Sequence, residues 1–177
     1  MDFDLVEKQI VYAGKIIRLE RHRLDTPHGI RFREICVHPG ACVILPMITA
    51  DTVLLIRNYR YAVGQELLEL PAGTLEANET PMNSAGRELL EETGYVAGRM
   101  TPLGSFYASP GVMTEKMHCF VATELTHQGQ QLQEGEEIEL APTGYDRALD
   151  MIAVGDIVDG KTIAALLMYD RFHRGKK

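Results

Sequence analysis

The sequence contains few cysteines, and this scarcity excludes whole classes of protein. Only three occur among the 177 residues, at Cys36, Cys42 and Cys119, and no two of them form a C-x-x-C pair. A disulfide framework of the kind found in small secreted domains needs an even and denser set. We therefore expect reduced thiols, buried as small hydrophobic side chains, in a cytoplasmic protein.

Positive charge and long apolar runs are also scarce. The chain has 18 lysines and arginines against 25 aspartates and glutamates, for a net charge of −7. Proteins that bind nucleic acid through its phosphates usually carry a basic face, so we expect no nucleic-acid partner. No stretch is apolar over the length that a bilayer requires, and residues 1–15 begin with acidic residues where a signal peptide would have a basic region. We therefore expect neither a membrane partner nor a signal peptide.

The sequence contains enough apolar residues to form one domain with a small appendage. Hydrophobic residues make up 45% of the chain, which suffices for a core without disulfide staples. Residues 15–24 and 30–38 alternate apolar and polar positions on either side of a turn at 25–29, the pattern of an antiparallel hairpin. We therefore expect an antiparallel β subdomain at residues 1–38 and a main domain at residues 39–177.

The main domain shows strand patterns first and helical patterns later. Strands are expected where apolar residues are dense or alternate, and helices where apolar residues recur every three to four positions. A polar stretch at residues 126–137 is expected to form a mobile loop. The expected strands cover residues 41–49, 52–59, 66–73, 102–109 and 116–125, and the expected helices cover residues 81–93, 145–155 and 161–174.

One stretch matches a phosphate-binding motif, but its context argues against that role. Residues 155–162, GDIVDGKT, satisfy the P-loop pattern G-x-x-x-x-G-K-T. A P-loop follows a buried strand, whereas a helix is expected before this segment, and Asp156 and Asp159 would repel phosphates. Only fifteen residues follow it, too few for the rest of such a fold. We interpret the segment as a connection between helices with Asp159 or Gly160 near the cap, and we expect Lys161 to contact no phosphate.

A second pattern, from Gly73 to Tyr95, concentrates carboxylates on one short helix. Glu88 lies three residues before Glu91 and four before Glu92, so all three project from one side of a helix, one turn apart. Like charges at this spacing cost roughly 0.2–0.5 kcal/mol per pair, and the helix has no lysine to offset them. A solvated acidic face is the alternative. Hard oxygen ligands at this spacing favour a site for Mg²⁺ or Mn²⁺, whose binding would relieve the repulsion.

This second pattern resembles the signature of the Nudix hydrolases at every fixed position. The resemblance implies an α/β fold with α+β character, in which a mixed sheet lies in an α/β/α sandwich and a small antiparallel β subdomain precedes it. It also implies an enzyme that cleaves nucleoside diphosphates linked to another moiety and uses Mg²⁺. By the same resemblance, Arg87 and Glu79 orient the metal site, while Gly73 and Gly94 allow its turns. The implied metal ligands are Glu88, Glu91, Glu92 and the backbone carbonyl of Ala72.

The similarity extends to one branch of that family, the ADP-ribose and nucleotide-sugar pyrophosphatases. The stretches ELLELPAG, SFYASPG and GDIVDGKTIAALL look like this branch, and the similarity covers most of residues 30–170. The branch carries a proline about fifteen residues past the signature. Pro110 stands fifteen residues after Tyr95, and the resemblance implies that it contacts the substrate.

The branch also implies a catalytic base outside the signature, on a loop before a late strand. In this sequence the loop is QEGEEIEL, residues 133–140. The resemblance implies that Glu134 is the base and that Glu136 is a metal-contacting carboxylate. A shift of register would give these roles to Glu137 and Glu139, and a plain acidic solvent loop is the structural alternative.

Four more residues are implied to contact the substrate. Arg60 matches an arginine that contacts the phosphates or the distal sugar in the branch, a role suited to bidentate guanidinium hydrogen bonds. A surface arginine on an edge strand is the alternative. Glu69 would hydrogen-bond a ribose or cap the site. Phe32 and Arg33 would stack on the nucleobase of a partner subunit's substrate, although Phe32 could equally belong to the core.

These implications predict a Mg²⁺-dependent pyrophosphatase, with Mn²⁺ as a possible substitute, that acts as a homodimer on a small nucleotide sugar. The first expectation is hydrolysis of ADP-ribose to AMP and ribose 5-phosphate, and the alternative is a GDP-mannose-type hydrolase. A non-catalytic nucleotide-binding module is the alternative of another class. Such modules typically lose signature glutamates, and this chain keeps them all. An RNA-cap hydrolase is disfavoured by the acidic balance.

Overall fold

Two units make up the part of the chain that the computed structural model describes, residues 3–175. One unit contains the residues up to Gly40 together with residues 107–116, and the other contains residues 41–106 and the chain after residue 116. Within residues 3–175, no helix combines the length and the apolar character needed to cross a bilayer.

The N-terminal unit is an antiparallel sheet of three strands in the order β1-β2-β3, which are Asp4–Ala13, Arg18–Asp25 and Arg31–Val37. The expected hairpin corresponds to β2 and β3, and β1 adds a third strand on its open edge. The segment 107–116 joins this unit because the Cys36 backbone N–H donates to the carbonyl of Val112 at 2.8 Å, and the Thr114 N–H donates back to Cys36 at 3.0 Å. A segment distant in sequence is therefore part of the unit.

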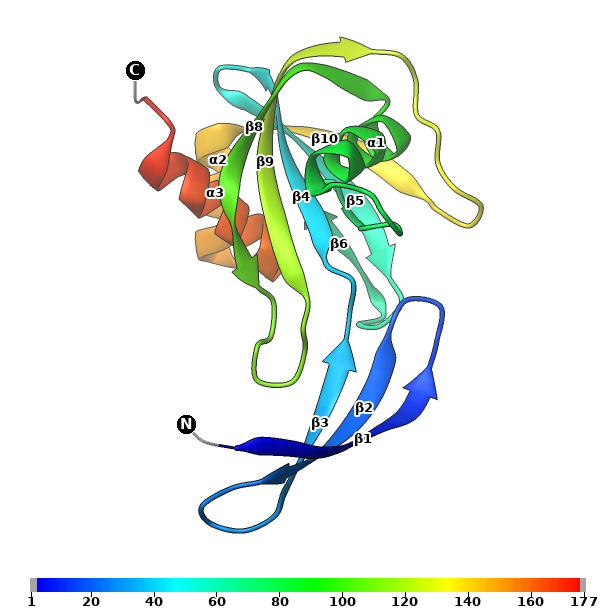
Figure 1. Ribbon diagram of the computed structural model, residues 1–177. Helices are drawn as coiled ribbons and strands as arrows, with labels where there is room; N and C mark the ends of the chain where they lie inside the picture. The colour runs from blue at the N-terminus through cyan, green and yellow to red at the C-terminus, as the bar shows by residue number, and fades with distance from the viewer. Residues whose placement is uncertain (1–2, 176–177) are drawn as a thin grey trace. The chain divides into compact units, whose positions relative to one another are not determined.

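The main unit is built on a mixed seven-stranded sheet (Figure 1). Its path is β10-β5-β4-β9-β8, with β6 paired to β5 and β7 paired to β4. Strand β4 runs parallel to β9 and antiparallel to β5 and β7. The strands are β4 (Ala41–Thr49), β5 (Thr52–Arg60), β6 (Gln65–Glu69), β7 (Ala72–Thr74), β8 (Tyr95–Tyr107), β9 (Lys116–His127) and β10 (Ile138–Gly144).

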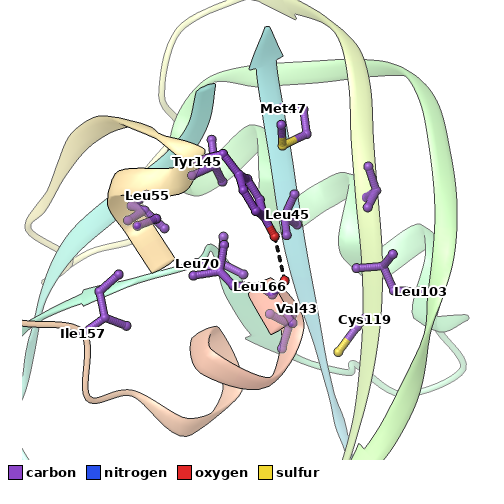
Figure 2. Packing of buried hydrophobic residues seen from close by; sticks show 14 of the residues in the cluster. Val43, Leu45, Met47, Leu55, Leu70, Leu103, Cys119, Tyr145, Ile157 and Leu166 are labelled. Atoms are coloured by element: carbon purple, nitrogen blue, oxygen red, sulfur yellow. Dashed lines mark hydrogen bonds between the residues drawn. The ribbon is translucent and has the colours of Figure 1, made fainter. Parts of the chain in front are cut away.

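Helices cover both faces of this sheet, as the α/β/α expectation requires. Side chains of β4 alternate between the faces. Val43 and Leu45 lie in the cluster that includes Leu166, on the face covered by α2 (Tyr145–Val154) and α3 (Gly160–Phe172). The opposite cluster contains Ile44 and the buried side of α1 (Pro81–Thr93). At the first face, the buried Tyr145 hydroxyl donates to the Leu166 carbonyl at 2.6 Å (Figure 2).

The expected strand at residues 66–73 is wrong in one respect, because the structure divides it into β6 and β7. The backbone N–H of Leu70 donates to the Thr162 hydroxyl at 2.8 Å instead of to a neighbouring strand. Pro71 has no N–H to donate. The ladder therefore ends after Glu69 and starts again at Ala72, on β4 instead of β5.

Candidate active site

Helix α1 begins and ends where the sequence predicts. The Thr80 side chain accepts the N–H of Asn83 at 3.3 Å, Pro81 opens the helix, and Gly94 follows its end with φ of 74°. These are local capping preferences. Buried Leu89 fixes the helix against the sheet. The helix therefore presents a defined side, and that side carries the carboxylates.

Two of those carboxylates lie against the backbone of β7. The Ala72 N–H donates to Oε2 of Glu92 at 2.9 Å. A Cβ atom at position 73 would lie 1.9 Å from the carboxyl carbon of Glu88, so only glycine permits this approach. Glu88 and Glu92 are 8% and 4% exposed. The structure thus brings together three of the residues that the sequence predicts for the metal site.

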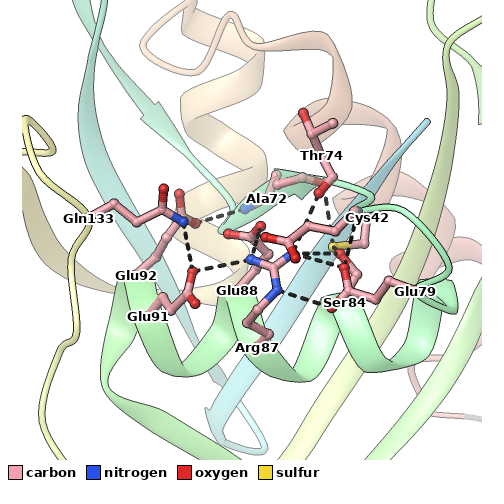
Figure 3. A network of polar contacts seen from close by, with 12 residues as sticks. Cys42, Ala72, Thr74, Glu79, Ser84, Arg87, Glu88, Glu91, Glu92 and Gln133 are labelled. Carbon is pink, nitrogen blue, oxygen red and sulfur yellow. Dashed lines mark hydrogen bonds and ion pairs between the residues drawn. The ribbon is translucent and has the colours of Figure 1, made fainter. Parts of the chain in front are cut away.

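Arg87 lies at the centre of a polar network beside these residues (Figure 3). Its guanidinium makes a bidentate contact with Glu79, with both distances 3.0 Å. Its Nη1 donates to Glu88 at 2.7 Å and to Glu91 at 3.2 Å. The Ser84 hydroxyl also accepts from Arg87. Arg87 therefore orients two of the predicted ligands directly, and Glu79 holds Arg87 in turn.

Burial and charge perturb these groups in opposite directions. Burial raises the pKa of Glu92 to about 8, although the Ala72 N–H opposes the shift. Burial also raises the pKa of Glu88, against the effect of Arg87. The Arg87 guanidinium lowers the pKa of Glu79 and has its own pKa raised by the contact. Glu92 is therefore a buried carboxylate whose negative charge is poorly compensated by the chain itself.

The donor set fits a divalent cation in its chemistry. Carboxylate and carbonyl oxygens are the ligands that Mg²⁺ and Mn²⁺ prefer, and an additional positive charge would compensate Glu88 and Glu92. Among residues 3–175, no three acidic, histidine or cysteine side chains already converge on one point. Arg87 instead lies between Glu88 and Glu91. Arg87 contacts Oε1 of Glu88 and Oε2 of Glu91, so a cation would bind these carboxylates through their other oxygens.

The polar segment after β9 is irregular, as expected, and it is hydrogen-bonded to the end of α1. The Gln128 N–H donates to Gly94, and the Gln131 N–H donates to Glu91. The Gln130 side chain donates to the carbonyl of Glu92 at 2.8 Å. The sequence showed only a polar stretch, so these glutamines could not be singled out from it.

Of the four candidate glutamates in that segment, Glu136 interacts with the α1 carboxylates. Its charge helps to raise the pKa values of Glu88 and Glu92. Its carboxylate accepts the N–H of Gln133, whose side chain donates to Glu91 at 3.2 Å. All four are exposed: Glu134, Glu136 and Glu137 lie in the loop, and Glu139 lies on β10 opposite Arg57.

Arg60 and Glu69 form a second charged group. Nε and Nη2 of Arg60 donate to the two carboxylate oxygens of Glu69 at 2.8 and 2.6 Å. Lys161 donates to the same carboxylate at 2.5 Å. Glu69 raises the pKa of Arg60, and Glu92 adds to the shift, so this group interacts electrostatically with the α1 carboxylates. The sequence predicted Arg60 and Glu69 but not Lys161, whose partner is 92 residues away.

The predicted base contacts, Phe32 and Arg33, lie in the N-terminal unit and point to opposite faces of β3, because successive strand residues alternate. Their contact with a nucleobase stays a prediction. The guanidinium of Arg21 lies 4.3 Å from the centre of the Phe32 ring. These two line a hollow of about 250 Å³ with Arg23 and two residues of β1.

Pro110 also lies in the N-terminal unit, in an exposed turn. The Ser109 carbonyl accepts the N–H groups of both Val112 and Met113, at 3.1 and 2.9 Å. The turn is tied to the end of β3 through Cys36. Pro110 is thus part of the loop that completes this unit.

Comparison with known proteins agrees with the architecture and the signature. The NUDIX domain family model matches residues 37–159. An ADP-ribose pyrophosphatase of Bacillus subtilis (strain 168) is 34% identical over 164 residues, which are 91% of this chain and 89% of that protein. A GDP-mannose pyrophosphatase of Escherichia coli O139:H28 (strain E24377A / ETEC) is 35% identical over 173 residues, 93% of this chain and 82% of that protein. The crystal structure of an ADP compounds hydrolase superposes with a TM-score of 0.88 at 23% identity, covering 99% of this chain and 96% of that one.

Proposed function

The chain belongs to the NUDIX domain family, and from this premise we propose that it hydrolyses the diphosphate of ADP-ribose to give AMP and ribose 5-phosphate. The observation that carries the proposal is the set of carboxylates on one side of α1, with Glu88 and Glu92 buried against the backbone of β7. The relative of similar length that is named an ADP-ribose pyrophosphatase supports this choice of substrate.

Nudix hydrolases generally use divalent metal ions, and we propose Mg²⁺ here, with Mn²⁺ able to replace it. The residues that would hold it are Glu88, Glu91, Glu92, the carbonyl of Ala72 and Glu136. When bound, the metal neutralises charge on the diphosphate and lowers the pKa of water. The uncompensated burial of Glu92, whose pKa is raised to about 8, supports this assignment.

The side chains around this set have separate tasks in the proposed reaction. Arg87 holds Glu88 and Glu91 in place. Arg60 binds the diphosphate or the distal sugar through the part of its guanidinium that Glu69 does not occupy. Glu134 takes the proton from the water that attacks phosphorus, while the bond between phosphorus and the leaving oxygen breaks. The exposed position of Glu134 leaves it accessible to such a water.

A GDP-mannose-type reaction is the second candidate, and one observation favours it. The relative named a GDP-mannose pyrophosphatase is 35% identical over 93% of this chain, which matches the similarity of the ADP-ribose relative. The choice between the two depends on the base and the distal sugar. Both candidates use the same carboxylates, so the signature does not separate them.

We also propose a cytoplasmic homodimer that is joined through the N-terminal sheet. Large apolar side chains lie exposed along β1 and its turn, where Leu5, Ile10, Val11 and Ile16 are 54%, 56%, 54% and 54% exposed. A second copy of the sheet could cover them across a two-fold axis. The hollow beside Phe32 would then be available for the substrate base of the other subunit.

A substrate panel tests the proposed function directly. The purified chain is incubated with ADP-ribose, GDP-mannose and other nucleotide sugars, with Mg²⁺, with Mn²⁺ or with a chelator, and the products are separated by chromatography. We expect AMP and ribose 5-phosphate from ADP-ribose, only when a divalent metal is present. The Glu92→Gln variant is the matched control. Binding of these compounds without hydrolysis under any metal condition would instead identify a binding module.

A further inference from the structure

Residues 155–162, which connect α2 to α3 and form the first turn of α3, take no part in the proposed chemistry, yet their side chains are tied to the site. Lys161 donates to Glu69 at 2.5 Å and to Oδ2 of Asp159 at 2.9 Å. Asp159 also caps α3 by accepting the N–H of Thr162 at 3.0 Å. The segment is a helix connection, as the sequence predicts, but its lysine points to a buried carboxylate.

That carboxylate, Glu69, is fully buried and is shared by two cations. Its Oε2 accepts from Arg60 at 2.6 Å and from Lys161 at 2.5 Å. The Lys161 side chain is only 10% exposed, whereas the Arg60 side chain is 39% exposed. Arg60 donates to Glu69 through Nε and Nη2, and its Nη1 group takes no part in this contact. Of the two cations, Arg60 is thus the one that is accessible to a ligand.

Lys161 partly neutralises the Glu69 carboxylate and so weakens the electrostatic effect of Glu69 on Arg60. A carboxylate divided between two cations neutralises neither of them fully, so Arg60 retains attraction for an anion. Without the ammonium group, Glu69 would bind Arg60 alone, and Asp159 would lose a cation at 2.9 Å. Charges in a partly buried site are screened less than charges at the surface. The same site would then attract a diphosphate less strongly.

The backbone around Glu69 is held by the first turn of α3. The Thr162 hydroxyl accepts the N–H of Leu70 at 2.8 Å, and both residues are fully buried. Two residues further along, the N–H of Ala72 donates to Glu92 on α1. The short segment that carries Glu69 is therefore fixed to α3 on one side and to α1 on the other.

We propose that Lys161 is a positioning residue for substrate binding. It holds Glu69 between its own ammonium group and the guanidinium of Arg60, and so keeps Arg60 oriented and sufficiently positive to bind the anionic part of a nucleotide sugar. This inference rests on the proposed function. The residue does not touch the substrate, and its effect passes through Glu69.

Kinetics with ADP-ribose and GDP-mannose provide the first test. Lys161→Met should raise KM about tenfold, a loss of about 1.4 kcal/mol in binding, with kcat changed less than about threefold. Lys161→Arg should restore KM to within about threefold. The matched control is Arg147→Met, which removes a cation 3.9 Å from Asp156 in the same connection and should leave KM unchanged. An unchanged KM in Lys161→Met would overturn the inference.

A double-mutant cycle with Glu69→Gln separates positioning from direct contact. If Lys161 acts through Glu69, then Lys161→Met should add less than about twofold to KM once Glu69 is replaced. Independent effects that multiply would mean that Lys161 contacts the substrate itself. Thermal unfolding of each variant tests whether it is folded. Lys161→Gln replaces Lys161→Met in the cycle if Lys161→Met does not fold.

A third measurement needs no turnover. The NMR signal of the Arg60 Nε–H group reports its hydrogen bond to Glu69. It should shift in Lys161→Met and stay in place in Arg147→Met, whether or not ADP-ribose is a substrate. If the wild type hydrolyses no nucleotide sugar and the signal still shifts in Lys161→Met, the proposed function is refuted and the linkage is kept. An unshifted signal would refute the linkage.

Discussion

The N-terminal sheet and the α1 site each bury a glutamate, and the two glutamates behave in opposite ways. Glu20 is 1% exposed and Glu92 is 4% exposed. Glu20 is within 3.0 Å of Lys8, Arg18 and His22, and these contacts, with His22 the largest cause, lower its pKa to about 2. Burial raises the pKa of Glu92 to about 8.

The difference shows where each charge is compensated. In the N-terminal sheet, the chain supplies its own cations and leaves its apolar side chains outside, so what this sheet lacks is an apolar partner. The main unit has a buried core of two apolar clusters and leaves the charge of Glu92 without an adequate cation. We infer that a second copy completes the first region and a divalent metal completes the second.

The largest expected effect comes from removing the uncompensated charge. Glu92→Gln or Glu88→Gln should lower kcat at least about a hundredfold, because electrostatic stabilisation at a reacting centre is often worth about 3–4 kcal/mol. Steady-state kinetics at saturating Mg²⁺ measure the loss. Glu20→Gln is the contrasting variant, and it should keep kcat near wild type. Full turnover by the Glu92 variant would remove that residue from the metal site.

The next effect tests the close approach of Glu88 to β7. Gly73→Ala puts a Cβ atom where the Glu88 carboxyl group now lies, 1.9 Å away, so we expect kcat/KM to fall at least about tenfold, or 1.4 kcal/mol. Gly86→Ala is the matched control on α1, where an added Cβ meets nothing within 4 Å. It should stabilise the helix by about 0.5–1 kcal/mol and leave turnover unchanged. Equal kinetics in the two variants would contradict the described geometry.

A smaller effect tests the apolar surface of the N-terminal sheet. Ile10 is 56% exposed, and Ile10→Asp should weaken self-association at least about tenfold, since burying such a side chain is worth about 1.5–3 kcal/mol. Sedimentation over a range of concentrations measures the dimer. Val158→Asp, which changes an equally exposed residue (55%) of the main unit, should not affect it. A wild-type chain that sediments as a monomer at micromolar concentration would refute the dimer.

The subtlest effect is that the two glutamates give stability opposite pH dependences in metal-free protein. The folded pKa of Glu92 is raised, so its contribution makes unfolding easier as pH rises from about 4.5 to about 8. The folded pKa of Glu20 is lowered, so its stabilising contribution is lost as pH falls from about 4.5 to about 2. Urea unfolding measures the free energy of unfolding across pH. Its fall between about pH 4.5 and 8 should disappear in Glu92→Gln, and its fall between about pH 4.5 and 2 should disappear in Glu20→Gln. Slopes that persist in both variants would contradict the contrast.

Local signals predicted the site helix well. Thr80, Pro81 and Gly94 determine where α1 begins and ends through contacts within one turn, and such contacts can be read along the chain. The spacing of Glu88 and Glu92 likewise determined that they share one side. The family and its sandwich fold followed from the same short pattern.

Long-range partners could not be predicted from the sequence. The break between β6 and β7 depends on Thr162, which is 92 residues from Leu70. Lys161 and Glu69 are also 92 residues apart, so their contact could not be read from the sequence. Phe32 lies beside Arg21 because of the register between β2 and β3. That register cannot be read from which residues are neighbours in the sequence.

Metal-dependent stability tests the central claim most directly. Thermal unfolding of the wild type, Glu92→Gln and Glu20→Gln is measured in chelator and in excess Mg²⁺ or Mn²⁺, because a ligand that binds only the folded state raises the midpoint. The account predicts that the metal raises the midpoint of the wild type and of Glu20→Gln, and raises that of Glu92→Gln much less. A midpoint that does not respond to metal, or that rises equally in Glu92→Gln, would contradict it.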